Sequence, residues 1–162
     1  GENVENALLL HVGVGIGGAL IFNREVYSGR RGFAGEIGML SVLFNGEQYT
    51  FDGVCSFIGI KKYLKKKYNV DLSYKEIVHT HVNETAREMG KILKDLTEFL
   101  EFDEVIIGGF AVDFGMEYLE IVQSELDKSL NGTVAKYSAL KGHASMIGAA
   151  QKATENLTAT LF

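Results

Sequence analysis

The chain has 162 residues, a formal net charge of −5, 46% hydrophobic residues and a single cysteine. These values fit one globular domain and exclude a disordered tail, a coiled coil, an internal disulfide framework and a zinc site built from several thiolates of this chain. The acidic balance argues against nucleic-acid binding by the whole domain, and no apolar run reaches the roughly 18 residues of a membrane-spanning helix, so we expect no membrane partner.

Glycine makes up 19 of the 162 residues and proline none, and the positions of the glycines are informative. Four of them follow a mostly apolar stretch at residues 6–12 and precede a hairpin whose turn is Asn23-Arg24. A second glycine-spaced stretch covers residues 28–38, and Asn45-Gly46 is typical of a turn. The strands predicted in this part cover residues 6–12, 19–22, 25–27 and 39–44.

From about Asp52 the hydrophobic pattern lengthens to the period of helices. The elements predicted, in chain order, are a helix around 58–64, a short helix capped by Ser73, a long helix capped by Asn83, a strand at 105–107, a helix from 118 to a C-cap at Asn131-Gly132, a strand at 133–137 and a last helix at 145–153. This order predicts an α/β fold with antiparallel pairing at one edge of the sheet and parallel crossovers at the other. No linker or repeat interrupts the pattern, so we expect residues 1–162 to form a single domain.

Residues 13–18, GVGIGG, formally match the pattern G-x-G-x-x-G. A dinucleotide site needs a helix to begin at such a loop, whereas this loop leads into a strand, which argues against that interpretation. A glycine loop between two strands can still hold a phosphate, because bare backbone allows close approach and lets consecutive N–H groups point at one anion. The alternative is a tight turn that binds nothing.

Four ordered motifs cover nearly the whole chain: the glycine loop with its hairpin from Leu8, GRRGFAGEIGM at 29–39, DEVIIGG at 103–109 and HASMIGAA at 143–150. Together they resemble the ROK family of bacterial sugar kinases and sugar-responsive repressors. The resemblance implies an actin-like ATPase, ribonuclease-H-like lobe with a mixed sheet, an antiparallel meander and flanking helices. It also implies that this is the C-terminal lobe, with the N-terminal lobe and any DNA-binding domain absent from this chain.

The resemblance assigns ligand roles to several glycines and one glutamate. Glu36, with its neighbour Gly35, would bind the sugar; the alternative is a surface or helix-capping glutamate. ATP with Mg would be the cofactor, bound at five glycines, which are Gly13, Gly15 and Gly17 at the phosphates and Gly108 and Gly109 at the adenosine. The alternative for the last two is a plain strand-to-loop turn. The family's general base lies on the N-terminal lobe, so we expect no catalytic residue here and no activity from the fragment alone.

Three features depart from the family pattern. Val14 stands where the family has a threonine, whose hydroxyl could bond a phosphate oxygen. Met39 stands where the family has a histidine that binds both sugar and zinc. Of the family's cysteine cluster only Cys55 remains, and Phe57 stands where the family has a sugar-binding glutamate. A structural zinc needs four ligands, so we expect no metal. We expect Cys55 to be a buried small hydrophobe and not a reactive thiol.

For the histidines and the lysine-rich stretch, we expect structural roles and not ligand binding. His11 lies in a predicted strand, where a satisfied core histidine is the expectation. His79 and His81 lie at a predicted helix end, with metal binding as the alternative. His143 stands where the family usually has an aspartate. The alternative to a structural role is a position near the nucleotide. The stretch Lys61–Lys67 is typical of a solvated helix face, the alternative being a position near DNA in a repressor.

Two functions follow from the resemblance. In the first, the chain is the sugar-sensing effector lobe of a ROK-type transcriptional regulator, in which closure of the lobes on a sugar shifts a DNA-binding domain. In the second, it is the C-terminal lobe of an ATP-dependent sugar kinase of the glucokinase or N-acetylhexosamine kinase type. Both imply a cytoplasmic protein that binds a sugar, contacts its own N-terminal lobe, forms a homo-oligomer and reaches DNA only through an absent domain.

Overall fold

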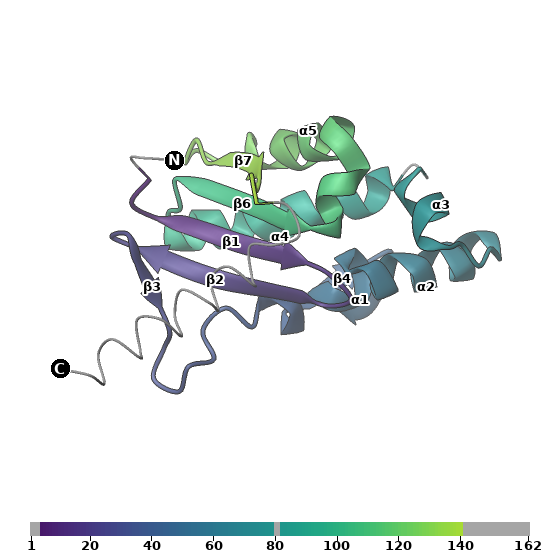
Figure 1. Cartoon of the computed structure of the whole chain (residues 1–162), viewed down its shortest axis with the longest axis horizontal. Coiled ribbons are helices and arrows are strands. Elements are labelled where there is room, and N and C mark those ends of the chain that lie inside the picture. Colours follow the sequence, from purple (N-terminus) through teal and green to yellow (C-terminus); the bar gives the residue numbers. More distant parts are fainter. Residues whose placement is uncertain (1–3, 80–81, 141–162) are drawn as a thin grey trace.

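A computed structural model describes residues 4–79 and 82–140 and has a mixed five-stranded sheet at its centre (Figure 1). In spatial order the strands are β3 (Glu25–Tyr27), β2 (Ile16–Phe22), β1 (Ala7–Val12), β6 (Glu104–Gly109) and β7 (Val134–Tyr137). The first three pair antiparallel, and β1, β6 and β7 pair parallel. This confirms the α/β class and the predicted division of the sheet into an antiparallel and a parallel edge.

The helices lie on one side of the sheet and beyond its end (Figure 1). The longest pair, α4 (Asn83–Leu100) and α5 (Gly115–Leu126), pack against each other, and α5 also packs against β7. The smaller elements are η1 (Ile37–Met39), β4 (Ser41–Phe44), β5 (Glu47–Thr50), α1 (Phe51–Cys55), α2 (Phe57–Tyr68), α3 (Tyr74–Val78) and η2 (Phe110–Phe114). β4 and β5 form a separate two-stranded sheet, closed by the predicted Asn45-Gly46 turn, and β5 is a strand that the sequence pattern did not indicate.

The core lies between the sheet and the long helices. Alternate residues of β1, Leu8, Leu10 and Val12, are fully buried, because successive side chains of a strand point to opposite faces. On the helix side, Met89 and Leu93 of α4 complete the same cluster. Their spacing of four residues places them on one face of the helix, as the sequence predicted.

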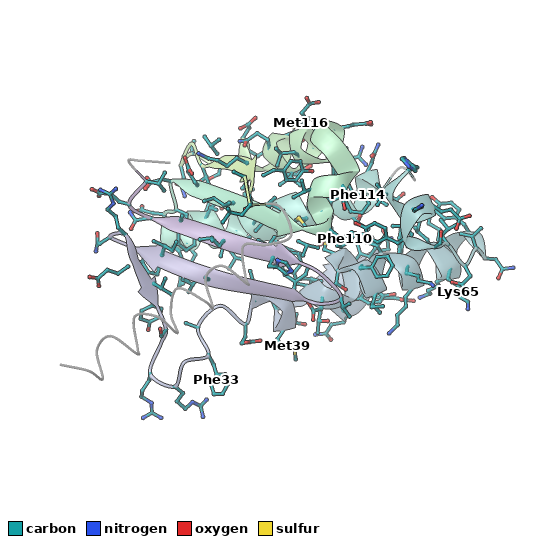
Figure 2. All side chains as sticks on the ribbon, viewed as in Figure 1. Phe33, Met39, Lys65, Phe110, Phe114 and Met116 are labelled. Carbon is teal, nitrogen blue, oxygen red and sulfur yellow. The ribbon has the colours of Figure 1, made fainter. Side chains whose placement is uncertain are left out.

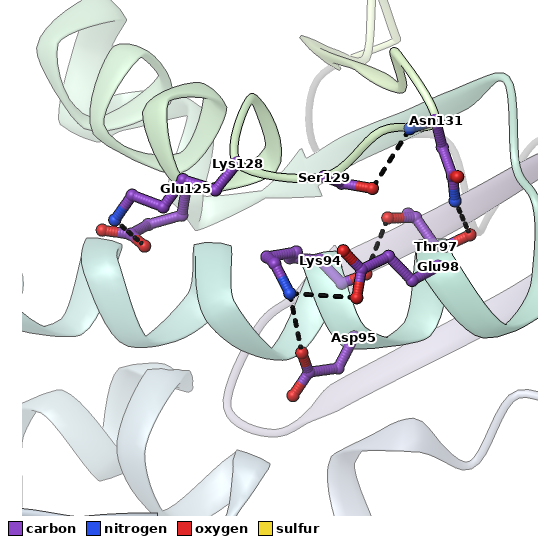
Figure 3. A network of polar contacts seen from close by, with 8 residues as sticks. All are labelled: Lys94, Asp95, Thr97, Glu98, Glu125, Lys128, Ser129 and Asn131. Atoms are coloured by element: carbon purple, nitrogen blue, oxygen red, sulfur yellow. Dashed lines mark hydrogen bonds and ion pairs between the residues drawn. The ribbon is translucent and has the colours of Figure 1, made fainter.

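Helix ends follow the predicted capping residues in some places and not in others. Ser73 caps α3 with Glu76 in a capping box, as expected. Asn83 is the first residue of α4 and not its cap. The expected C-cap of α5 at Asn131-Gly132 is wrong, since the helix ends at Leu126. Asn131 instead donates its side-chain amide to the Thr97 carbonyl in the last turn of α4, at 2.8 Å (Figure 3).

None of the described helices has the length and apolar character to cross a membrane. His81, His143 and the helix predicted at 145–153 lie outside the described residues.

Candidate functional site

The glycine loop joins β1 to β2 and is held from both sides. The Gly13 N–H donates to the Gly15 carbonyl across the turn at 2.8 Å, and the Gly13 carbonyl accepts from the Phe57 N–H at 3.0 Å. Because β2 begins at Ile16, directly after the turn, no helix starts here, as the sequence predicted. The hairpin continues to Asn23-Arg24, where both residues have positive φ. Val14 at the tip of the loop is 75% exposed.

The Gly108-Gly109 pair lies beside this loop, since β1 and β6 are parallel neighbours. His11 pairs with Gly108, and Val12 pairs with Gly109. A cavity of about 280 Å³ opens at this point, and its lining residues are His11, Val12, Gly13, Tyr74, Gly109, Phe110, Val112 and Asp113. The fold thus brings two of the predicted nucleotide-side glycines, one from each motif, to the carboxyl ends of adjacent parallel strands, where α/β folds commonly hold ligands.

An aromatic cluster forms one wall of this cavity. The Tyr74 and Phe110 rings line it, and each packs on Phe57, with ring centroids 5.7 and 5.6 Å apart. Phe110 also meets Phe114 edge-on at 5.1 Å, and both are labelled in Figure 2. The Tyr74 hydroxyl donates to the Asp113 carboxylate, and burial, followed by this bond, raises the pKa of Tyr74 to about 12. Sequence reasoning missed this wall, because its members come from three separate elements.

A larger cavity of about 510 Å³ lies on the other face of the sheet. Its lining is mostly apolar and includes Leu9, Leu10, His11, Gly17, Gly18, Ala19, Ile21, Val26, Ile106, Gly108 and Ser138. Two predicted nucleotide-side glycines, Gly17 and Gly108, therefore line this second cavity and not the first. His11 is common to both cavities.

The expectation that His11 is a satisfied core histidine is wrong. Its side chain is half-buried, and its Nδ1 atom is buried without a hydrogen-bond partner in the described part of the chain. The reason lies in the alternation of β1. Leu10 and Val12 are buried in the core, so the His11 side chain points to the opposite face of the sheet, where it lines both cavities.

The predicted sugar-side residues lie next to the hairpin, outside both cavities. Gly35 accepts from the Gly18 N–H at 2.8 Å and has a φ of 95°, and the Gly18 carbonyl fills the space that a Cβ at Gly35 would need. This close approach requires glycine. Glu36 follows with an exposed side chain. It stands at the N-cap position of η1 but makes no capping hydrogen bond, which argues against the helix-capping alternative.

Asp52 is a residue of the site that sequence reasoning did not single out. Its carboxylate accepts a hydrogen bond from the Ile16 N–H, at the end of the glycine loop. A Cβ added to Gly15 would lie 3.1 Å from the same carboxylate, so Gly15 faces Asp52 and neither cavity. An aspartate in the first turn of a predicted helix is common, and nothing in the local sequence indicates that this one reaches back by 36 residues.

Cys55 is fully buried, as predicted. Its thiol contacts the Thr85 carbonyl at 3.6 Å, and burial, with a smaller contribution from Glu88, raises the pKa of the Cys55 thiol well above its usual range. The residues that take the place of the family's zinc ligands do not fit a zinc ion, since Met39 is 69% exposed and Cys55 is enclosed. Within residues 4–79 and 82–140, no three His, Cys, Asp or Glu side chains gather to hold a metal.

The lysine-rich segment forms a solvated face, as predicted, and most of its lysines are paired with acidic side chains. Lys61 and Lys65 pair with Asp71, Lys66 with Glu47, and Lys67 with Glu84. These pairs are largely exposed, so each contributes little to stability. His79 ends α3 and is exposed.

The architecture and the motif positions agree with one protein family. The sequence model of the ROK family matches residues 1–156. The chain belongs to the ROK family. Its fold is that of the ROK sugar kinases, with a TM-score of 0.79 to a ROK glucokinase from Streptomyces griseus crystallised with glucose and AMPPNP. That structure is 22% identical, and the match covers 92% of this chain and 60% of that one.

Curated ROK relatives include both kinases and repressors. An N-acetylmannosamine kinase from Vibrio vulnificus is 26% identical over 141 residues, which are 78% of this chain and 48% of the kinase. A xylose repressor from Staphylococcus xylosus is 25% identical over 145 residues, which are 85% of this chain and 37% of the repressor. The chain thus spans about half or less of the length of these relatives.

Proposed function

We propose that this chain is the C-terminal, sugar-sensing lobe of a cytoplasmic ROK-type transcriptional regulator. The whole protein would add an N-terminal lobe and a DNA-binding domain, and the sugar would bind in the cleft between the lobes. Closure of the cleft would change the geometry of the DNA-binding domains in a homo-oligomer. In this proposal the general base of the family lies on the N-terminal lobe, so this lobe binds sugar and does not catalyse a reaction by itself.

The observation that carries this proposal is a contrast between the sugar side and the phosphate side of the site. On the sugar side, Gly35 locks the segment against β2 and leaves the Glu36 carboxylate exposed, where it can accept hydrogen bonds from two sugar hydroxyls. On the phosphate side, Val14 presents an apolar side chain at the tip of the loop, 75% exposed. Phe57, whose side chain offers no hydrogen bond, stands where the resemblance places a second sugar-binding glutamate, so Glu36 is the carboxylate that this proposal assigns to the sugar.

A second candidate function is the C-terminal lobe of an ATP-dependent sugar kinase. The cavity between Gly13 and Gly109 supports it, because its aromatic wall suits a purine ring. Of the five predicted glycines, Gly13 and Gly109 line this cavity, so Gly13 would contact the phosphates and Gly109 the adenosine. Mg would bridge the phosphates, and no zinc would be needed.

The test uses the full-length protein that carries this chain. Calorimetry over a panel of pentoses, hexoses and N-acetylhexosamines should find a sugar that binds, and a coupled ATP-dependent phosphorylation assay with the same panel should find no turnover. Glu36→Gln should weaken sugar binding at least tenfold, because a neutral amide accepts weaker hydrogen bonds than a carboxylate. Turnover of any sugar supports the kinase instead.

The matched control is Glu25→Gln, which makes the same change at an exposed residue of β3. It should leave sugar affinity unchanged. Equal losses from the two variants would show that Glu36 does not contact the sugar.

A further inference from the structure

One face of the central sheet carries no helix among the described residues. Helices α4 and α5 lie on the other face, where Leu8, Leu10 and Val12 of β1 are buried (Figure 1). The residues between these three point to the open face, because side chains alternate along a strand. Parallel strands are normally covered on both faces, so the open face indicates a second covering element.

The register of the strands gathers apolar residues on this open face. Leu9 of β1 pairs with Ala19 of β2 on one side and with Ile106 of β6 on the other, and directly paired residues share a face. All three line the cavity of about 510 Å³, as does Val26 at the edge of the sheet. The cavity is thus an apolar surface that runs across four neighbouring strands, and such surfaces mark sites of contact.

The centre of this surface is bare and holds one unsatisfied polar atom. His11 pairs with Gly17 and Gly108, whose lack of side chains lets a covering element approach the backbone closely. The Nδ1 atom of His11 is buried and has no hydrogen-bond partner among the described residues. Buried polar atoms are normally hydrogen-bonded, so the covering element should also bring a polar group.

The chain itself continues beside this surface after β7. Ser138 lines the cavity, and its N–H donates to the Ile107 carbonyl at 2.8 Å, which holds the chain to the sheet at this place. Residues 141–162 come next and lie outside the described residues. As a helix they would extend about 33 Å, against about 20 Å across five strands, so they are long enough to cross the sheet.

The sequence of residues 141–162 has the pattern that this surface requires. An apolar stripe with spacings of four, three and four positions consists of Met146, Ala150, Ala153 and Leu157. This spacing is that of one face of a helix, and the charged residues Lys152 and Glu155 fall outside that face. The two alanines of the stripe are small enough to pack closely on the bare backbone of Gly17 and Gly108.

We propose that residues 141–162 form a helix that closes the larger cavity, with this stripe packed across β1, β2 and β6. Gly17, Gly108 and His11 then belong to an internal packing surface of the lobe and do not contact a nucleotide. Of the two cavities, the one lined by Gly13 and Gly109 is left for a ligand. The closure goes beyond the proposed function and does not depend on it, since it would hold equally in a sensor lobe and in a kinase lobe.

The experiment places a photo-cross-linker on the open face in the full-length protein. Val26 lines the cavity and is 66% exposed, so replacing it with p-benzoylphenylalanine should not disturb folding. After irradiation, mass spectrometry should find position 26 joined to a peptide from residues 141–162, in a product that runs as a monomer on a denaturing gel. A cross-link to the N-terminal lobe, a product of dimer mass or the absence of any cross-link overturns the proposal.

The matched control places the same cross-linker at Leu43. This residue also lies in a strand, is 72% exposed and lines neither cavity. It should not capture residues 141–162. Equal capture from both positions would mean that the segment is not fixed on the sheet, and the proposal would fail.

A pair of substitutions tests the stripe with the same readout. Ala150→Glu puts a charge into the stripe, so the cross-link from position 26 should fall at least about tenfold in yield, because an unpaired charge is costly to bury. Ala159→Glu makes the same change on the opposite side of the helix and should leave the yield unchanged. An unchanged yield in Ala150→Glu overturns the packing of the stripe.

Hydrogen exchange on the unaltered full-length protein gives a result that needs no variant. Peptides from residues 145–157 should exchange at least about a hundredfold more slowly than the same sequence as a free peptide, because a helix docked on the core is protected. Exchange at the rate of the free peptide overturns the proposal. Sugar calorimetry on the same protein tests the sensor function separately, so either can fail while the other stands.

Discussion

At the scale of single residues, the region between the two cavities depends on one backbone contact. Gly109 has a φ of 78°, and the Val12 backbone fills the space where a side chain would begin. Two parallel strands can approach here only because one of them lacks a Cβ. This contact places the end of β6 beside the glycine loop.

Gly109→Ala should therefore lower the free energy of unfolding by roughly 2–4 kcal/mol, because it combines an unfavourable φ with a backbone clash. Urea denaturation followed by circular dichroism measures the loss. Gly115→Ala is the control, since Gly115 has the same φ of 78° and nothing within 4 Å of its added Cβ. The control should cost roughly 1–3 kcal/mol from its backbone conformation alone, and less than Gly109→Ala. Equal costs would mean that the Val12 contact contributes nothing.

At the scale of elements, the helix pair α4 and α5 depends on a small residue at its crossing point. Gly90 lies on the buried face of α4, and a Cβ there would lie 2.6 Å from the Glu125 Cβ and 2.9 Å from the Val122 carbonyl oxygen. Glu125 is itself buried in this contact and is paired with Lys128 at 2.5 Å (Figure 3). The distance between the two helices is therefore set at Gly90.

Gly90→Ala tests this packing against helix propensity. In an exposed helix the change would stabilise the protein by about 1 kcal/mol. Here it should destabilise it by roughly 1–3 kcal/mol, because two backbones must separate. Thermal and urea unfolding give the sign directly. Glu120→Ala on the exposed face of α5 should stay within about 0.5 kcal/mol of the unaltered protein. A stabilised Gly90→Ala protein would contradict the close packing.

The elements also differ in how well the sequence predicts them. Strand β1, the turn at Asn23-Arg24 and helix α4 follow local rules of burial, turn geometry and period, and the sequence located them within a few residues. The end of α5 was misplaced, because Asn131 bonds to α4, 34 residues away. The wall at Tyr74 and the Asp52 contact likewise join elements distant in sequence, and no local pattern encodes such contacts.

At the scale of the whole molecule, one hydrophobic cluster connects the sheet, the small hairpin and the helices. It includes Leu8 of β1, Phe44 of β4, Cys55 of α1 and Val122 of α5. Elements that share a core lose their packing together, so the described part of the chain should unfold in one cooperative transition.

Cys55 reports on this transition, because it is the chain's single cysteine and is fully buried. Its thiol should react with a thiol reagent only in proportion to the unfolded fraction measured by circular dichroism in urea. In Glu120→Cys, the added exposed thiol should react at once and Cys55 only on unfolding. Rapid modification of both thiols without denaturant would show that the core opens locally.

The mixed sheet also carries a consequence for the order of folding. β1 pairs with β2 across a turn of only three residues, so this pairing is local. The pairing of β1 with β6 spans a long stretch of chain, since Asn6 and Asp103, which bond at its start, are 97 residues apart. Such non-local pairing slows folding. We therefore expect the nascent lobe to form its glycine hairpin first and to complete the cavity between Gly13 and Gly109 last. A ligand of that cavity can recognise only a lobe whose folding is finished.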